Sequence, residues 1–137
     1  MDRVSFFELS TPDAAKEKAF FSDVFGWELT QWGGQDYWLA KTGPADKPGI
    51  DGALQPPKMD DAPRVVNTIS VDDIDDTVVR AIAAGATVMV DKMEVEGMGM
   101  LAYLMSPTGI PFGVMQMMPG AMNMTPDDMK MMPDAMM

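Results

Sequence analysis

The strongest constraint on the fold is a plan that occurs twice in the sequence. One copy, residues 8–29, reads ELSTPDAAKEKAFFSDVFGWEL, and the other, residues 69–90, reads ISVDDIDDTVVRAIAAGATVMV. In each copy the end of a strand is followed by helix-capping residues, a helical segment, a glycine and a second strand. A single copy has too little core to fold alone, so we expect the two to pack together, with any functional site between them.

The first half of the chain predicts a β-α-β-β-β order. Thr11 is expected to cap a helix over about residues 13–24, and Gly26 is expected to end it. Phe20 and Phe21 are each followed four residues later by an apolar side chain, which predicts an apolar stripe along this helix. Strands are predicted over residues 4–9, 27–32, 37–42 and 50–54, with a hairpin joining the second and third.

The second half repeats this order. A strand is predicted over residues 64–71, a helix starts after Asp72 and Asp73, and Gly85 ends it. Strands follow at about 87–90, 101–105 and 111–117, and superposing Gly85 on Gly26 places Asp72 on Asp13. We therefore predict one domain over residues 1–117, with modules at about 4–55 and 64–117 and a proline-rich linker at 56–63. Residues 118–137 form a methionine-rich tail.

Composition excludes several kinds of site. The chain has no cysteine and no histidine, so disulfides and thiolate chemistry are excluded, and any acid–base work falls to carboxylates, tyrosine or lysine. The formal net charge of −11 would repel phosphate backbones and anionic lipid. We expect no nucleic-acid partner and no membrane partner. The sequence shows neither a signal peptide nor a membrane-spanning run, which predicts a cytoplasmic location.

With this element order the sequence resembles the vicinal oxygen chelate (VOC) superfamily, which includes glyoxalase I, bleomycin-resistance proteins and extradiol dioxygenases. The segments that carry the resemblance are FFELSTPDAAKEKAFFSDVFGWEL, YWLAKTG, VVNTISVDDIDDTVVRAIAAGA and SPTGIPFGVMQ, within residues 4–117. The resemblance implies an α+β glyoxalase/bleomycin-resistance-like fold of two βαβββ modules, whose curved sheets face each other across a central cleft. It also implies a homodimer, as in many relatives.

Metal-dependent members of that superfamily hold their metal with four ligands, usually His or Glu, on the first and last strands of each module. The resemblance places these ligands at Phe6, at Leu54 or Gln55, at Val66 and at Gly113. Only Gln55 has a side chain that can donate to a divalent metal. We therefore expect no metal and no other cofactor.

Glu8 is the candidate catalytic residue. Strand alternation places it on the same face as Phe6, which the resemblance assigns to the cleft, and desolvation there would suit a carboxyl group to acid–base work. The alternative is a structural role, in which Glu8 pairs with a Lys, an Arg or a backbone donor, or lies at the rim of the cleft. Thr68 is the corresponding polar residue of the second module, although a hydroxyl in a strand is commonly satisfied by neighbouring backbone.

The other candidate ligand-binding residues are aromatic or contain sulfur. Tyr37 and Trp38 point to opposite sides of one strand, so one of them should line the cleft, and Tyr103 poses the same question in the second module. Packing is the alternative role for these side chains and for Met115. The complete predicted set of ligand-binding residues is Phe6, Glu8, Tyr37, Thr68, Tyr103 and Met115.

The sequence thus predicts a metal-independent protein that binds a small organic molecule in the cleft between the modules. One alternative is a metal-dependent lyase, isomerase or dioxygenase, with Glu8 and other oxygen groups as ligands. Another is a sequestering protein of the drug-resistance type that captures a cationic compound. The thioethers of the tail suit Cu(I), but a packing or dimer-contact role is the expectation for that segment.

Overall fold

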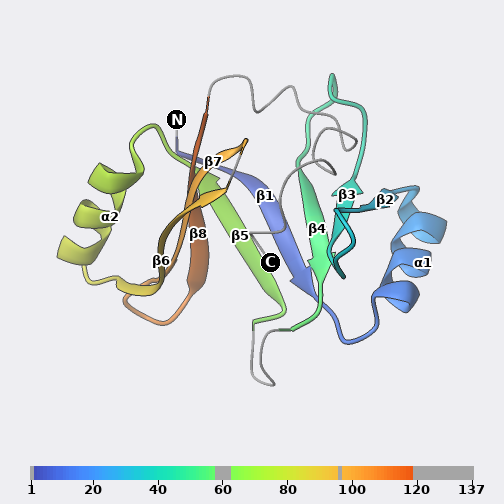
Figure 1. The fold of residues 1–137 in the computed structure, drawn as a ribbon, viewed down its shortest axis with the longest axis horizontal. Helices are drawn as coiled ribbons and strands as arrows, with labels where there is room; N and C mark the ends of the chain where they lie inside the picture. Colours follow the sequence, from blue (N-terminus) through green and yellow to red (C-terminus); the bar gives the residue numbers. More distant parts are fainter. Residues whose placement is uncertain (1, 58–62, 96, 119–137) are drawn as a thin grey trace.

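The computed structural model describes residues 2–57, 63–95 and 97–118. Its elements follow the βαβββ order twice (Figure 1). The first module contains β1 (Arg3–Ser10), α1 (Ala14–Phe25), β2 (Glu28–Gln31), β3 (Trp38–Lys41) and β4 (Asp51–Gln55). The second contains β5 (Val65–Ser70), α2 (Ile74–Ala83), β6 (Thr87–Val95), β7 (Gly99–Met105) and β8 (Pro111–Met117). The predicted α+β order is confirmed, whereas the predictions for most of the linker and for the tail fall outside the described residues.

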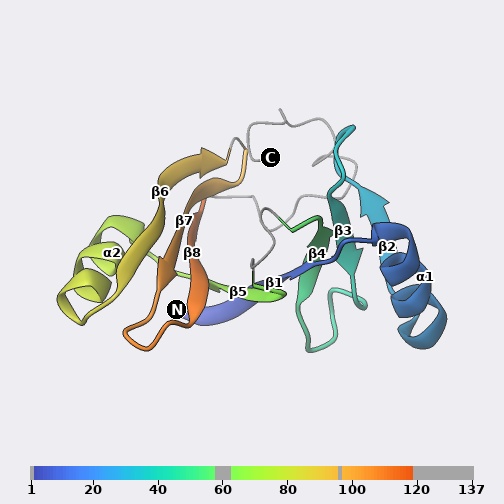
Figure 2. The same ribbon diagram turned by 90° about the horizontal axis from the view of Figure 1, so that it is seen from below.

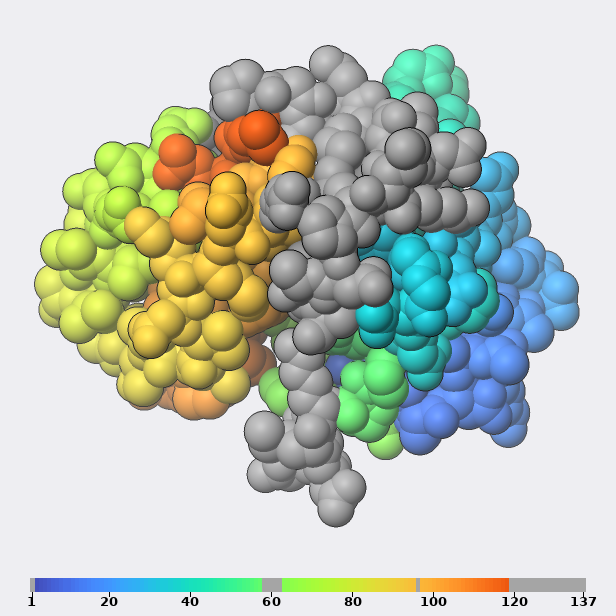
Figure 3. Space-filling view, viewed as in Figure 1, coloured from blue at the N-terminus to red at the C-terminus, as the bar shows by residue number. Residues whose placement is uncertain are grey.

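The strands form one eight-stranded sheet in the order β2-β3-β4-β1-β5-β8-β7-β6. Within each module the first strand pairs in parallel with the last, and β1 pairs antiparallel with β5 to join the modules. Figure 2 shows the two halves of the sheet rising on either side of β1 and β5, with α1 and α2 on their outer sides. The two modules occupy opposite sides of the molecule (Figure 3). The predicted pair of facing sheets is therefore one continuous sheet that bends.

The helix caps differ slightly from those predicted. Asp13 caps α1, because its side chain accepts a hydrogen bond from the backbone N–H three residues later. The prediction that Thr11 is the cap is wrong, because α1 starts one residue later than expected and leaves Asp13 next to its first turn. Asp73 caps α2 in the same way, so Asp13 corresponds to Asp73 and not to Asp72. Gly26 ends α1 in the left-handed conformation, as predicted.

The apolar stripe of α1 does not enter a closed core, although its spacing predicts a buried face. Three of its side chains are more than half exposed: Phe20, Val24 and Phe25. Phe21 stacks on Trp27 with 4.5 Å between ring centroids, and Trp27 lies 5.6 Å from Phe7 of β1. The indole of Trp27 therefore stands between the helix and the sheet and spreads the stripe over an aromatic cluster.

The core is divided between the two faces of the sheet. One cluster packs with α2 on the outer face of the second module: Val71, Ile74, Ala102, Leu104 and Val114. A second cluster belongs to the first module: Trp32, Tyr37, Leu39 and Ala53. A third belongs to the second module: Val95, Leu101 and Met115. Most members of the last two clusters also line the cavity described next, so the two modules present apolar walls to each other.

Candidate functional site

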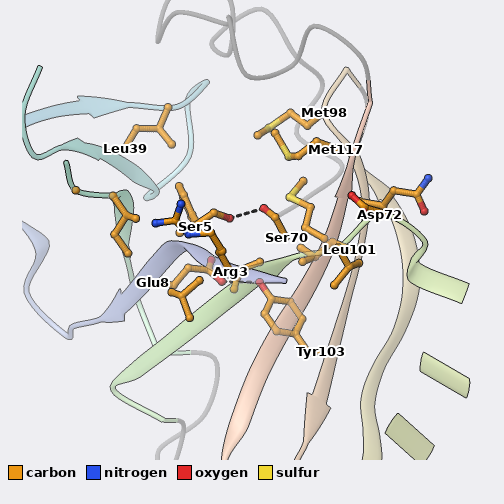
Figure 4. Close-up of a pocket in the computed structure, with 18 of the residues that line it drawn as sticks. Arg3, Ser5, Glu8, Leu39, Ser70, Asp72, Met98, Leu101, Tyr103 and Met117 are labelled. Atoms are coloured by element: carbon orange, nitrogen blue, oxygen red, sulfur yellow. Dashed lines mark hydrogen bonds between the residues drawn. The ribbon is translucent and has the colours of Figure 1, made fainter. Parts of the chain in front are cut away.

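A cavity of about 900 Å³ occupies the space between the two modules, over β1 and β5. Residues of β1, of the β2–β3 connection and of β3 line one side, and residues of β5, β7 and β8 line the other (Figure 4). A volume of this size is in the range of pockets that hold drug-sized molecules.

All six residues that the sequence predicts to bind a ligand line this one cavity: Phe6, Glu8, Tyr37, Thr68, Tyr103 and Met115. Their role in binding stays a prediction, but the structure brings them together from β1, β5, β7, β8 and the connection between β2 and β3. Of the two neighbouring aromatic residues, Tyr37 lines the cavity and Trp38 does not. Trp38 lies under Lys18, whose Nζ is 3.2 Å from the ring centroid.

Several lining residues escape sequence reasoning. The pairing of β1 with β5 shifts register between Val4 and Phe6, so strict alternation fails there and Ser5 also lines the cavity. The hydroxyls of Ser5 and Ser70 form a hydrogen bond of 2.5 Å between the two central strands. Trp32 follows β2 and packs edge-on against Tyr37 at 5.3 Å. No local pattern predicts a bulge or the fold of a turn over the cavity, which is why these residues are absent from the predicted set.

Gly113 makes room for a tyrosine to lean across the sheet. One cross-strand row runs over β1, β5, β8 and β7, in which each residue is the Cα partner of the next: Phe6, Thr68, Gly113 and Tyr103. A Cβ atom at Gly113 would lie 2.8 Å from Thr68 Oγ1 and 3.3 Å from Tyr103 Cε1. Because that position has no side chain, the Tyr103 ring packs over the backbone with its hydroxyl toward Glu8 (Figure 4).

The Glu8 carboxylate is the polar centre of the cavity. It is only 5% exposed, and each of its oxygens accepts one tyrosine hydroxyl. Tyr37 donates to Oε2 at 3.1 Å, and Tyr103 donates to Oε1 at 2.5 Å. One donor comes from each module, so the carboxylate links the two halves of the protein. The structural alternative predicted a basic side chain or a backbone donor beside Glu8. The structure has two phenol hydroxyls in that place.

Both tyrosines are held in their protonated form. Burial raises the pKa of Tyr37 well above its usual value, and the negative charge of Glu8 raises it further. The same two causes, again with burial the larger, raise the pKa of Tyr103. The phenols therefore remain hydrogen-bond donors throughout the neutral range. Neither supplies a positive charge to balance a carboxylate.

The donor set around Glu8 does not fit a divalent metal ion. The oxygen atoms that contact it belong to protonated phenols, whose lone pairs are weak ligands for a hard cation. Three of the places that the resemblance assigns to ligands have no donating side chain, namely Phe6, Val66 and Gly113, and Gln55 does not line the cavity. Within residues 2–57, 63–95 and 97–118, no three Asp, Glu, His or Cys side chains gather as a metal site would require.

Two βαβββ modules joined in one bent sheet around a central cavity define the VOC fold class. The family model described as a glyoxalase-like domain matches residues 6–115. The chain therefore belongs to the glyoxalase-like domain family, within the VOC superfamily.

Comparison with known proteins agrees with this assignment. Proteins called "Putative glyoxylase CFP32" from Mycobacterium bovis and Mycobacterium tuberculosis are 28% identical over 114 residues. The match covers 80% of this chain but 43% of each relative, so the chain spans less than half of their length.

Solved structures share the fold at low identity. A glyoxalase/bleomycin resistance protein/dioxygenase superfamily member from Vibrio splendidus is 20% identical, with a TM-score of 0.61 over 86% of this chain and 100% of that one. A methylmalonyl-CoA epimerase variant from Streptomyces coelicolor, in complex with 2-nitronate-propionyl-CoA, is 16% identical, with a TM-score of 0.61 over 85% and 95%. At these identities the likeness concerns the fold alone.

Proposed function

We propose that the chain binds a small organic molecule in the cavity between its modules, without a metal ion. The observation that carries the proposal is the buried Glu8 carboxylate, held by one tyrosine from each module in a cavity that is mostly apolar. An apolar pocket with a few convergent polar groups is the usual form of a small-molecule site. The apolar walls would take the body of the ligand, and Glu8 would orient its polar group.

Glu8 also has a geometry that suits proton transfer. A carboxylate offers about four acceptor positions, and the two tyrosine hydroxyls use one on each oxygen. A ligand proton directed at a remaining position would meet a base that its two partners hold in place. If the protein turns its ligand over by this route, deuterium from solvent will enter the ligand in the native protein and not in Glu8→Gln. Exchange that continues in Glu8→Gln would remove the catalytic role from this residue.

The binding proposal is tested by blocking the cavity. Ser70 lines it from β5, so Ser70→Phe would place a ring in the space that the ligand needs. Thr87→Phe makes a similar change at an exposed position of β6 and serves as the control. Compounds from a chemically diverse set are added while thermal unfolding is followed, and a ligand at a hundred times its Kd should add about 2.7 kcal/mol to the stability. Stabilisation should appear in the native protein and in Thr87→Phe and vanish in Ser70→Phe.

Two results would sink the binding proposal. One is that no compound stabilises the native protein, and the other is that every stabilising compound acts equally on Ser70→Phe. In the second case, a structure of the complex should show the compound bound away from Glu8.

A metal-dependent lyase or isomerase is the second candidate, and membership of the glyoxalase-like domain family favours it. It would require ligands other than those that surround Glu8, because phenols held in their protonated form do not replace His or Glu.

The proposed partners of the protein are otherwise a second copy of itself and a small molecule, with no nucleic acid, in keeping with the charge of −11. Sedimentation velocity tests the dimer directly. The described residues contain no helix of the length and hydropathy needed to span a bilayer.

A further inference from the structure

We propose that the ligand of this cavity is an organic cation, an amine or ammonium group on an apolar body, with its positive charge beside Glu8. The inference rests on the proposed binding function and adds the charge class of the ligand. It follows from the aromatic side chains around Glu8 and from the lack of an ion pair between Glu8 and a described basic residue.

The first argument is a buried negative charge without a positive partner. Glu8 is 5% exposed, and its two hydrogen-bond donors are neutral hydroxyls. The ion pairs between described residues are Arg80 with Asp76 and Lys92 with Asp75, and both lie on the surface at α2. Burying a carboxylate is costly unless a charge of opposite sign lies nearby. A cationic ligand would supply that charge, whereas an anionic one would double the cost.

Arg3 is the basic residue to consider as a partner of Glu8. It is the single Lys or Arg among the described residues that line the cavity, but its side chain is exposed and forms no ion pair with Glu8. Asp72 lines the cavity as well, so the charged groups of the lining sum to a net negative value. The charge of the lining residues therefore favours a positively charged ligand, even when Arg3 is counted.

The second argument is the aromatic character of the walls. Four lining residues carry aromatic rings: Phe6, Trp32, Tyr37 and Tyr103. The faces of such rings carry partial negative charge and attract organic cations, and the attraction grows when the site is shielded from water. Leu39, Leu101 and Met115 extend the apolar surface around the carboxylate. A carboxylate inside an aromatic cage offers a cation both an ion pair and favourable ring contacts.

The third argument is long range. The chain has a formal net charge of −11, from 21 acidic and 10 basic residues. A potential of this sign raises the local concentration of cations and repels anions before any contact forms. The global charge and the local charge of the cavity therefore select the same class of ligand.

The test compares three probes with one phenyl ring and side chains of similar length. Phenethylammonium is positive, phenethyl alcohol is neutral but keeps a hydrogen-bond donor, and hydrocinnamate is negative. Binding of each to the full-length protein is measured by isothermal titration calorimetry. We expect the ammonium probe to bind about tenfold more tightly than the alcohol, and hydrocinnamate not to bind.

Two variants locate the effect. Glu8→Gln removes the charge and keeps the shape, so the preference for the ammonium probe over the alcohol should disappear. Glu28→Gln makes the same change at an exposed position outside the cavity and should keep the preference. If Glu8→Gln fails to fold, Tyr103→Phe replaces it, because this variant keeps the ring and frees one carboxylate oxygen for the ligand. The preference for the cation should then increase.

The outcomes separate this inference from the function on which it rests. The inference of a cationic ligand is overturned if the native protein binds the alcohol and the ammonium probe equally, or if the preference survives in Glu8→Gln. Either result leaves the binding function in place. If none of the three probes binds, the charge of the compounds that pass the cavity-blocking test decides, and neutral or anionic compounds overturn the inference. If no compound passes that test, the binding function itself fails.

Discussion

Raising the pH gives a sharp test of the site, because the chain has only two tyrosines and both contact Glu8. All of the phenolate absorbance of the protein therefore reports on this cavity. Burial, and after it the charge of Glu8, raises the pKa of Tyr37 and Tyr103 above the usual value of about 10. At pH 10 about half of the tyrosines should be ionised in the unfolded chain, and far fewer in the folded protein.

The same shift makes stability depend on pH. Below about pH 10 both states keep their phenol protons, and the contribution of the tyrosines is complete. Above that pH the unfolded chain binds fewer protons than the folded one, so the free energy of unfolding falls as the pH rises. Each tyrosine should lower it by about 1.4 kcal/mol per pH unit, so the pair should lower it by about 2.8 kcal/mol per pH unit.

The assay follows ultraviolet absorbance at the phenolate band between pH 8 and the unfolding transition, with circular dichroism to monitor the fold. Folded protein should show a delayed rise that coincides with unfolding, and protein in guanidinium should titrate near pH 10. In Glu8→Gln the rise should begin at lower pH, because one of the two causes is removed and burial is left. Half-ionised phenols at about pH 10 with an intact fold would refute the buried arrangement.

Three further predictions concern the same cluster. Tyr37→Phe should lower the free energy of unfolding by about 1.5–3 kcal/mol, and by about 0.5–1.5 kcal/mol in a Glu8→Gln background, as measured in urea; equal losses would show that the hydroxyl is not bonded to a charged group. Gly113→Ala should lower the free energy of unfolding by about 1–3 kcal/mol, because the new methyl group meets Thr68 and Tyr103. It should also shift the phenolate titration to lower pH. An unchanged titration would contradict the close approach at Gly113. Protein purified without chelators should contain well under one equivalent of nickel, zinc, manganese or iron by elemental analysis. A stoichiometric metal would favour the metal-dependent candidate instead.

Several residues that line the cavity could be placed from the sequence. Strand alternation puts Phe6 and Glu8 on one face of β1, and the repeat identifies Thr68 as their neighbour from the second module. Alternation also separates Tyr37 from Trp38, although it leaves open which of them faces inward. These inferences succeed because side-chain direction in a strand has a period of two, which local sequence records directly.

The contacts between these residues could not be read in the same way. Tyr103 belongs to β7, which is three strands away from β1 in the sheet. In a flat sheet that separation is about 14 Å, longer than a tyrosine side chain, so the hydroxyl reaches Glu8 only because the sheet bends. The register shift in β1 and the exposed stripe of α1 cannot be predicted from local sequence for a related reason. Each depends on how surfaces from distant parts of the chain fit together.

The sequence by itself determined the two βαβββ modules, their helix ends near Gly26 and Gly85, and the placement of Phe6 and Glu8 on one face of β1. These features follow from interactions within a few residues, such as capping, backbone conformation and the alternation of apolar side chains. Only the tertiary structure decided that β1 pairs with β5 and that the joined sheet closes around one cavity. The meeting of Tyr37 and Tyr103 at one carboxylate is a consequence of that pairing, because it needs strands from both modules to bury their surfaces together.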